Sequence, residues 1–64
     1  MAHDRYILRK DNDVTWSIID VFLGLPVRVG RTVLFDLRLE EAAELIEALN
    51  RVDRLKRAYW HQKS

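Results

Sequence analysis

The chain has 64 residues, enough for one small domain, and 11 Lys and Arg against 10 Asp and Glu give it a formal net charge of +1. Hydrophobic residues make up 48% and charged residues 33%, which is typical of a folded protein rather than of a disordered tail. The absence of cysteine excludes disulfides and thiolate metal sites. Because domains of this size usually need disulfides, a metal or a partner subunit, we expect a partner subunit.

The first half of the chain predicts a sheet. Residues 6–8 predict a short strand and Asp11-Asn12-Asp13 a turn, since Asp and Asn side chains bond the nearby backbone. Residues 14–22 are rich in β-branched and aromatic side chains and predict a second strand. Both Gly and the one Pro lie within 24–30, so residues 27–35 form either one strand with a glycine bulge or a hairpin. Links this short predict three or four mostly antiparallel strands.

The second half predicts one helix. From residue 38 on, Leu, Ala, Glu and Arg dominate and neither Gly nor Pro occurs, which predicts a helix over 38–60 and a tail at 61–64. Asp36 is the residue best suited to cap its N-terminus. Residues 1–37 are then the sheet region of a single domain spanning 1–64. The predicted fold class is α+β, a small antiparallel sheet of three or four strands followed by one long C-terminal helix packed on one face.

The expected core lies between one face of the sheet and the helix. Trp16 and Ile18 share one face of the second strand, which Asp20 interrupts. Ile19 and Val21 share the other face, which is either a partly exposed apolar patch or a contact surface. The residues expected in the core are Tyr6, Leu8, Trp16, Ile18, Leu34, Ala42, Ile46 and Leu49.

The helix carries two apolar stripes. The first, Leu39, Ala42, Ile46 and Leu49, stops at Asp53 and is long enough to cover a small sheet. The second alternates by three and four residues, which is the spacing of a helix-on-helix seam. Either one broad helix face covers the sheet, or the second stripe meets a partner helix. The small size of the chain favours the partner, and the residues expected in this homodimer interface are Leu45, Ala48, Val52, Leu55 and Tyr59.

The charged residues of the helix predict whether the two helices of the homodimer run parallel or antiparallel. With Val52 at heptad position a, Arg51 falls at g and Lys56 at e, so a parallel pair would bring like charges together. An antiparallel pair sets the acidic first half, 40–47, beside the basic second half, 51–57, of the other copy. We therefore expect an antiparallel homodimer.

The chain offers no catalytic constellation. His3 and His61 lie at opposite ends, and the glycine-rich phosphate loop, the H-E-x-x-H motif and the calcium loop are all absent. Asp11-Asn12-Asp13 lacks the later Gly and Glu of a calcium loop and predicts a solvated turn. We expect a non-enzyme with no catalytic, cofactor-binding or metal residues and no cofactor.

Charge is unevenly distributed along the chain. Residues 1–50 contain six basic and nine acidic side chains, whereas 51–64 contain five basic and one acidic. Basic residues interleaved with aromatic ones can bind phosphate backbones and stack on bases, although a solvated helix end that pairs with the acidic half of a second copy has the same composition. The residues expected to contact nucleic acid or an acidic partner are Arg51, Arg54, Lys56, Arg57, Trp60 and Lys63.

Location and function follow from these patterns as expectations. No run approaches the roughly 18 consecutive apolar residues of a membrane span, and the first residues lack the basic-then-apolar order of a signal peptide. We expect a cytoplasmic bacterial protein with no membrane partner. It is a small non-catalytic protein-interaction module that acts as a regulator or inhibitor by docking on another protein. The alternative is a nucleic-acid-binding protein that uses its basic C-terminal helix.

Three stretches carry a resemblance to known families. Trp16-Ser17-Ile18-Ile19-Asp20, then residues 32–35 and Glu40-Glu41-Ala42-Ala43, resemble in outline the AP2-type and integrase arm-type DNA-binding domains, with three strands followed by a helix. The chain is also similar to small uncharacterised alphaproteobacterial proteins with a W-x-[VI]-x-D…G-x-P…E-E-A pattern and a final Leu-Asn pair, here Leu49-Asn50. The first resemblance implies DNA reading by Arg and Trp on the open sheet face. The second implies no known function.

The chain departs from the AP2-type pattern on that open face. Its central strand would present Ser17, Ile19 and Val21 there, with no basic residue among them.

Overall fold

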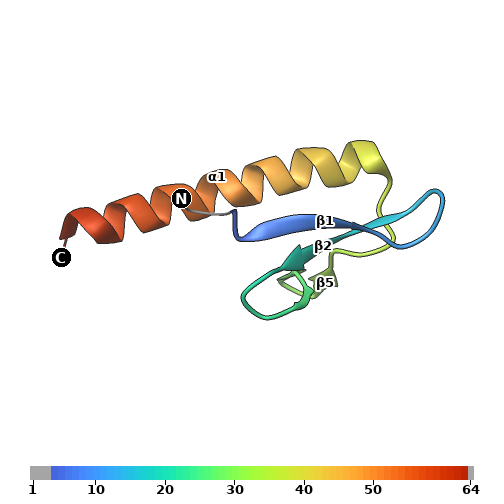
Figure 1. Ribbon diagram of the computed structural model, residues 1–64, viewed down its shortest axis with the longest axis horizontal. Coiled ribbons are helices and arrows are strands. Elements are labelled where there is room, and N and C mark those ends of the chain that lie inside the picture. Colours follow the sequence, from blue (N-terminus) through green and yellow to red (C-terminus); the bar gives the residue numbers. More distant parts are fainter. Residues whose placement is uncertain (1–3, 64) are drawn as a thin grey trace.

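The computed structural model describes the backbone of residues 4–63 and the side chains of residues 4–60. Three strands form an antiparallel sheet with the second strand in the middle, and two further strands form a separate hairpin. One long helix lies against the sheet and extends beyond it (Figure 1). The predicted α+β class is confirmed. The elements are β1 (Tyr6–Lys10), β2 (Trp16–Asp20), β3 (Leu25–Pro26), β4 (Arg28–Val29), β5 (Thr32–Val33) and α1 (Leu39–Lys63).

The turn between β1 and β2 depends on one side chain. The Oδ1 atom of Asn12 accepts hydrogen bonds from the backbone N–H groups of Val14 and Thr15, both at 2.9 Å. This is the local side-chain bonding that the Asp-Asn-Asp stretch predicts. It holds β1 and β2 in a register that pairs Tyr6 with Asp20.

The strand on the other side of β2 is interrupted by the β4–β5 hairpin. The N–H of Val27 donates to the carbonyl of Ile18 at 2.9 Å, and the N–H of Ile18 donates to the carbonyl of Leu34 at 3.0 Å. Leu34 and Val27 are themselves joined by a bond of 2.8 Å, from the N–H of Leu34 to the carbonyl of Val27. Residues 28–33 therefore project as a hairpin from what is otherwise one strand beside β2.

Residues 27–35 were predicted to form either one strand with a glycine bulge or a hairpin. Gly30 has a φ of 61°, and Arg31 does not share this positive φ. A positive φ at only the first central residue is the pattern of a type II′ turn, whose twist matches the flanking strands. Val29 and Thr32 pair directly across it. The segment is a hairpin rather than one bulged strand.

The core lies where β2, the base of the hairpin and the first helical stripe meet. Ile18 and Ala42 are fully buried, and Leu34 and Val27 are buried with them. Trp16, which was expected in the core, is only half-buried. Val27 and Leu37 were not expected there, because only the pairing of the interrupted strand with β2 places them inside. The partly buried residues around this core are Tyr6, Leu8, Leu37, Ile46 and Leu49.

The helix begins differently from the prediction. The carbonyl of Arg38 accepts the N–H of Ala42 at 2.9 Å, and Oε1 of Glu41 accepts the N–H of Arg38 at 3.3 Å. Arg38 is therefore the N-cap, and Glu41 supplies half of a capping box. The prediction of Asp36 as the cap is wrong, because Leu37 is still hydrogen-bonded to β2. Asp36 instead takes a left-handed conformation, with a φ of 58°, and turns the chain.

The helix is much longer than the sheet. Its 25 residues give a length of about 37 Å, whereas a five-residue strand spans about 17 Å. The C-terminal part of α1 therefore extends past the sheet (Figure 1). The tail expected at 61–64 is helical through Lys63, and Ser64 lies outside the described residues. Within the described part of the chain, no helix is both long enough and apolar enough to cross a membrane.

Candidate functional site

The second apolar stripe of α1 lies on the surface. Leu45 is 39% exposed, Val52 49%, Leu55 64% and Tyr59 53%, and Ala48 between them is also exposed. The helical spacing brings all five residues onto one face, as the sequence predicts. Because the first stripe already covers the sheet, the single chain does not use the second stripe in its core.

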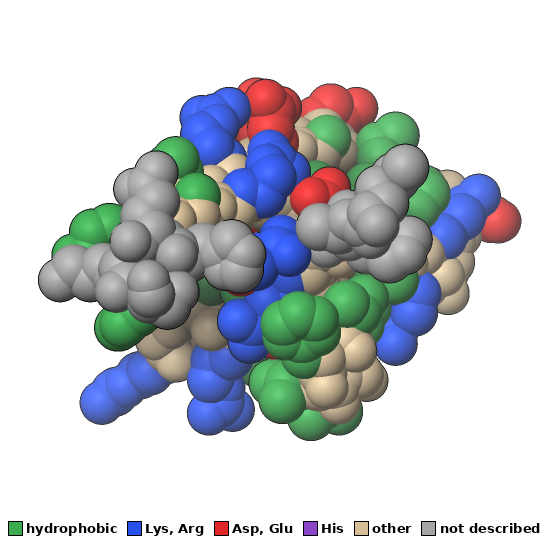
Figure 2. Space-filling view, turned by 60° about the vertical axis from the view of Figure 1, so that its left-hand side comes forward, with side chains coloured by type: hydrophobic (Ala, Val, Ile, Leu, Met, Phe, Trp, Pro, Cys, Tyr) green, Lys and Arg blue, Asp and Glu red, His purple; other side chains and the backbone are tan. Residues whose placement is uncertain are grey.

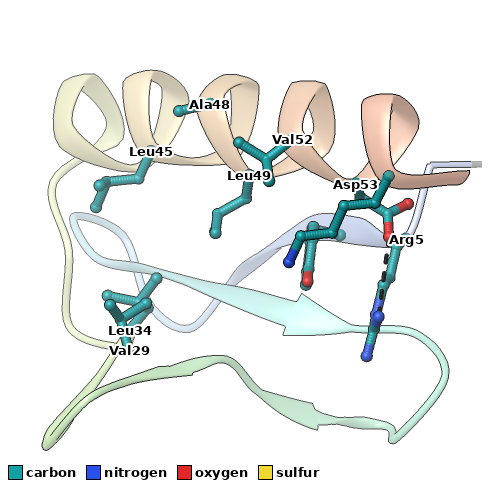
Figure 3. Close-up of a pocket in the computed structure, with 10 residues that line it drawn as sticks. Arg5, Val29, Leu34, Leu45, Ala48, Leu49, Val52 and Asp53 are labelled. Atoms are coloured by element: carbon teal, nitrogen blue, oxygen red, sulfur yellow. Dashed lines mark ion pairs between the residues drawn. The ribbon is translucent and has the colours of Figure 1, made fainter. Parts of the chain in front are cut away.

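A groove of about 320 Å³ runs beside this stripe. Leu45, Ala48 and Val52 line it from the helix, while Val29 and Leu34 line it from the hairpin side. Figure 3 shows Leu45 facing Leu34 and Val29 across the open space. The stripe and the groove thus share three residues and form one continuous apolar surface.

The other end of the groove is charged. Nη1 of Arg5 lies 3.8 Å from Oδ1 of Asp53 at this end (Figure 3). Nε and Nη2 of the same guanidinium lie 3.1 and 2.9 Å from Oδ2 of Asp20. Asp20 and Asp53 are both buried. The hydrogen bond from Arg5 holds the pKa of the Asp20 carboxyl below its usual value, and the N–H of Phe22 at 2.9 Å adds to this effect against the opposing effect of burial.

The first apolar stripe stops at Asp53, as the sequence predicts, but the buried face of α1 does not. This buried face continues through polar residues. Asn50 and Asp53 are 7% exposed each, and Nε of Arg57 lies 2.9 Å from Oδ2 of Asp53 without the geometry of a hydrogen bond. The carboxylate is buried because Arg5 and Arg57 compensate its charge, which spacing on the helix alone does not reveal.

The arginines expected to contact nucleic acid are engaged within the chain. Figure 2 shows Lys and Arg side chains on the face near the C-terminal end of α1, with acidic side chains beside them. The exposed pairs of Arg51 and Arg54 contribute little stability, but all three pairs neutralise charge that would attract phosphate. The pairs are Arg51 with Glu47 at 3.0 Å, Arg54 with Asp4 at 2.8 Å and Arg57 with Asp53 at 2.9 Å.

The other residues predicted to contact nucleic acid or an acidic partner do not lie together. Lys56 lines the groove. Trp60 is 68% exposed, and its ring meets the edge of the Tyr59 ring at a centroid distance of 6.1 Å. The side chain of Lys63 lies outside the described residues. The structure therefore pairs the arginines with acidic side chains and leaves Trp60 exposed beside Tyr59, one helical turn beyond Lys56 and Arg57.

A second exposed apolar cluster occupies the β2–β3 turn. Gly24 closes this turn with a φ of 71°. The guanidinium carbon of Arg5 lies 5.0 Å from the centre of the Phe22 ring. The sequence predicts Val21 and Phe22 within the second strand, 14–22, but β2 ends at Asp20, so both residues belong to the turn. The exposed members of the cluster are Val21, Phe22, Leu23 and Leu25.

On the sheet face opposite the helix, the side chains of β2 are buried, whereas Ile7 of β1 is 47% exposed. Ser17 is fully buried and Ile19 is 7% exposed, while Val21 beyond the strand is exposed. The Oγ of Ser17 donates to a carboxylate oxygen of Asp11, and this bond lowers the pKa of Asp11, with help from Arg9 at 3.0 Å. β2 carries no Arg on this face, whereas Arg9 of β1, which pairs with Ser17, lies on it.

The comparisons with known proteins do not indicate a function. No family model, curated protein or solved structure matches the chain. The stripe, the groove and the turn cluster are therefore the observations on which a function rests. Among the residues that the structure describes, no group of three His, Asp or Glu side chains is placed to hold a metal ion.

Proposed function

We propose that the protein is a small non-catalytic interaction module that works as an antiparallel homodimer, with the second stripe of α1 as its seam. The observation that carries the proposal is the exposure of this stripe along a helix that extends past its own sheet. Contiguous apolar surface of this kind on a small protein marks an interaction site. A second copy of α1 is the occupant that matches its three-and-four spacing.

The distribution of charge supports the antiparallel direction. The first half of α1 carries Glu40, Glu41, Glu44 and Glu47, and the second half is basic. Reversing one helix sets these halves side by side, whereas aligning the helices sets like charges together. Each exposed pair contributes only about 0.2–1 kcal/mol, so charge selects the direction and apolar burial supplies the affinity.

The turn cluster supports a second part of the proposal, which is docking on another protein. The β2–β3 turn lies on the far side of the sheet from α1 (Figure 1). A dimer joined through α1 therefore leaves Phe22 and Leu23, which are 66% and 67% exposed, available in both copies. A cytoplasmic regulator or inhibitor that binds its target through paired apolar turns is the function that fits this arrangement best.

Sedimentation of the intact protein tests the dimer. The monomer mass is 7.6 kDa, and we expect twice this mass at high micromolar concentration. The double variant Val52→Glu/Leu55→Glu should sediment as a folded monomer, because both side chains are exposed in the single chain. The control Val14→Glu/Leu23→Glu changes two apolar residues outside the stripe that are at least as exposed, and it should remain dimeric. A monomeric parent protein at high concentration contradicts the proposal.

The alternative, binding of nucleic acid by the basic end of α1, can be distinguished by the salt dependence of DNA affinity. Phosphate contacts release counterions, so DNA affinity would fall steeply as salt rises. We expect no such binding from the dimer at physiological salt. The alternative would be supported if the protein were a monomer, if it bound duplex DNA with a steep salt dependence, and if Arg54→Ala reduced its affinity for DNA. A pull-down that compares the parent protein with Phe22→Asp/Leu23→Asp tests docking through the turn.

A further inference from the structure

The groove between α1 and the hairpin has an apolar end and a charged end (Figure 3). At the apolar end, Leu45 of the helix lies opposite Val29 and Leu34. At the charged end, Arg5 and Asp53 line the groove. One chain supplies every residue of this lining, so a ligand site here does not depend on the homodimer proposed above.

The charged end of the groove carries one cation in excess. The carboxylate of Asp53 lies 3.8 Å from Nη1 of Arg5 and 2.9 Å from Nε of Arg57, and Arg5 is also paired with Asp20. Two carboxylates therefore balance two guanidinium groups. Lys56 lines the same groove, and among the residues that the structure describes it has no ion pair. Its ammonium group is the charge left to bind an anion.

The position of Lys56 on α1 directs its side chain along the groove. Lys56 follows Leu49, Val52 and Asp53 by seven, four and three residues, and all four line the groove. Long side chains on a helix point back toward its N-terminus, so the Lys56 stem runs over the turn that carries Val52 and Asp53. An anion held by its ammonium group then has the apolar end of the groove beside it.

We propose that the groove binds a small amphiphilic anion, with its apolar chain between Leu45 and the hairpin and its anionic group on Lys56. A mainly apolar pocket with a few placed polar groups is the usual form of a small-ligand site. The volume of about 320 Å³ is at the lower end of the range for such sites, which suits a single short chain. Asp53 does not repel the anion, because Arg5 and Arg57 compensate its charge. A short-chain carboxylate is the simplest ligand of this class.

Octanoate is the probe that tests this site. An NMR titration of the nitrogen-15-labelled protein should show saturable binding of one octanoate per chain, with the shifts concentrated at the groove. Octanol has the same chain without the charge and should bind about three- to tenfold more weakly. Octylammonium, with the opposite charge, should bind more weakly still. Butanoate should lose about tenfold or more, because each methylene that is buried adds up to about fourfold in affinity.

Two substitutions test the two ends of the groove. Lys56→Met keeps most of the stem but removes the charge, so it should weaken octanoate about three- to tenfold and leave octanol unchanged. The matched control Arg51→Met removes an exposed charge of α1 outside the groove and should bind octanoate like the parent protein. Val29 is 54% exposed on the hairpin, so Val29→Glu should fold and repel octanoate, whereas Val14→Glu, outside the groove, should not.

The outcomes for the ligand and for the homodimer can be separated. Leu55 belongs to the stripe but does not line the groove, so Leu55→Glu should weaken the seam and still bind octanoate. If neither the parent protein nor Leu55→Glu binds octanoate, the ligand site is wrong and the homodimer stands on its own evidence. Equal affinity for octanoate in Lys56→Met, or equal affinity of the parent protein for octanoate and octylammonium, would also overturn it. A parent protein that binds octanoate through Lys56 but sediments as a monomer would overturn the homodimer alone.

Discussion

At the scale of single residues, Asn50 joins the helix to the edge of the sheet. Its Oδ1 accepts the N–H of Tyr6 at 3.0 Å, and its Nδ2 donates to the carbonyl of the same residue at 3.1 Å. Tyr6 lies on β1, an edge strand, and turns these two groups away from β2. The buried amide therefore replaces a neighbouring strand at this point, and it sets the position of α1 along β1.

Replacing the Asn50 amide should destabilise the protein. Asn50→Ala removes both hydrogen bonds and leaves the backbone groups of Tyr6 without a protein partner, so we expect the free energy of unfolding to fall by about 1–3 kcal/mol. Urea unfolding followed by circular dichroism measures the change. The neighbouring Arg51→Ala, on the exposed surface, should stay within about 0.5 kcal/mol of the parent protein. Equal stability of the two variants would show that the Asn50 amide does not hold the helix.

The ion pair of Arg5 and Asp20 predicts a dependence on pH. Because the folded protein holds the pKa of Asp20 below its unfolded value of about 3.9, this carboxylate stabilises the fold above that pH. The stabilisation is lost as pH falls through the folded pKa, since the protonated form gives up its ion pair with Arg5. Asp20→Asn should therefore be less stable at neutral pH and should lose less stability below about pH 4.

Unfolding in urea along a series of pH values measures this dependence. Some acid sensitivity should remain in Asp20→Asn, because the pKa of Asp11 is also lowered by its bond from Ser17. Asp13→Asn, in the exposed β1–β2 turn, is the matched control and should follow the parent protein. A parent-like loss of stability in acid for Asp20→Asn would contradict the role of this pair.

At the scale of elements, sequence patterns predicted the helix, whose formation depends on neighbouring residues, but not the features that depend on contacts distant in sequence. The helix follows from a run without Gly or Pro, whereas Gly30 was compatible with either a bulged strand or a hairpin over 27–35. The N-cap was missed because its position depends on a contact between Leu37 and Trp16, 21 residues away in sequence. The charged end of the groove was missed for the same reason, since Arg5 meets Asp53 only after α1 has packed on the sheet.

The corrected N-cap offers a stabilising substitution. Arg38 has no side-chain acceptor for the free N–H groups of the first turn, whereas Ser, Thr, Asp and Asn supply one. Because Glu41 already bonds back to the N–H of residue 38, Arg38→Ser should complete a capping box. We expect a gain of about 0.5–1 kcal/mol in the free energy of unfolding. Arg31→Ser, in the hairpin turn, is the control and should bring no such gain.

At the scale of the whole molecule, the protein combines a small core with a long helix. Three buried apolar side chains, Ile18, Val27 and Leu34, form the central cluster. The helix provides more apolar surface than this core takes up, so burial of the excess depends on another molecule. Sequence periodicity predicted this excess, because two stripes can be counted along one helix. The groove could not be predicted, because it exists only where the hairpin base faces α1.

Dimerisation should therefore add stability that the monomer lacks. Binding that is restricted to the folded state raises the melting temperature with protein concentration. We expect this dependence in the parent protein and its absence in Val52→Glu/Leu55→Glu, measured by differential scanning calorimetry over the micromolar range. A melting temperature that is independent of concentration in the parent protein would contradict the homodimer.

Cysteine cross-linking should determine the direction and the register of the pair. The chain contains no cysteine, so each introduced thiol is the only one in its copy. A disulfide needs Cα atoms within about 7 Å. In a parallel pair Leu45→Cys faces itself and would cross-link alone. The antiparallel register that sets the acidic residues 40–47 beside the basic residues 51–57 places Leu45 of one copy opposite Leu55 of the other. In that register the two thiols of Leu45→Cys lie about 15 Å apart along the axis and should stay reduced.

The same register brings Leu45 of one copy opposite Leu55 of the other. An equimolar mixture of Leu45→Cys and Leu55→Cys should therefore form a mixed disulfide under mild oxidation, whereas neither variant should cross-link alone. Non-reducing electrophoresis and intact mass distinguish these products. A covalent dimer of Leu45→Cys by itself would show that the helices run parallel. A mixture without the mixed disulfide would exclude this register, because it requires residues 45 and 55 of the two copies to be in contact.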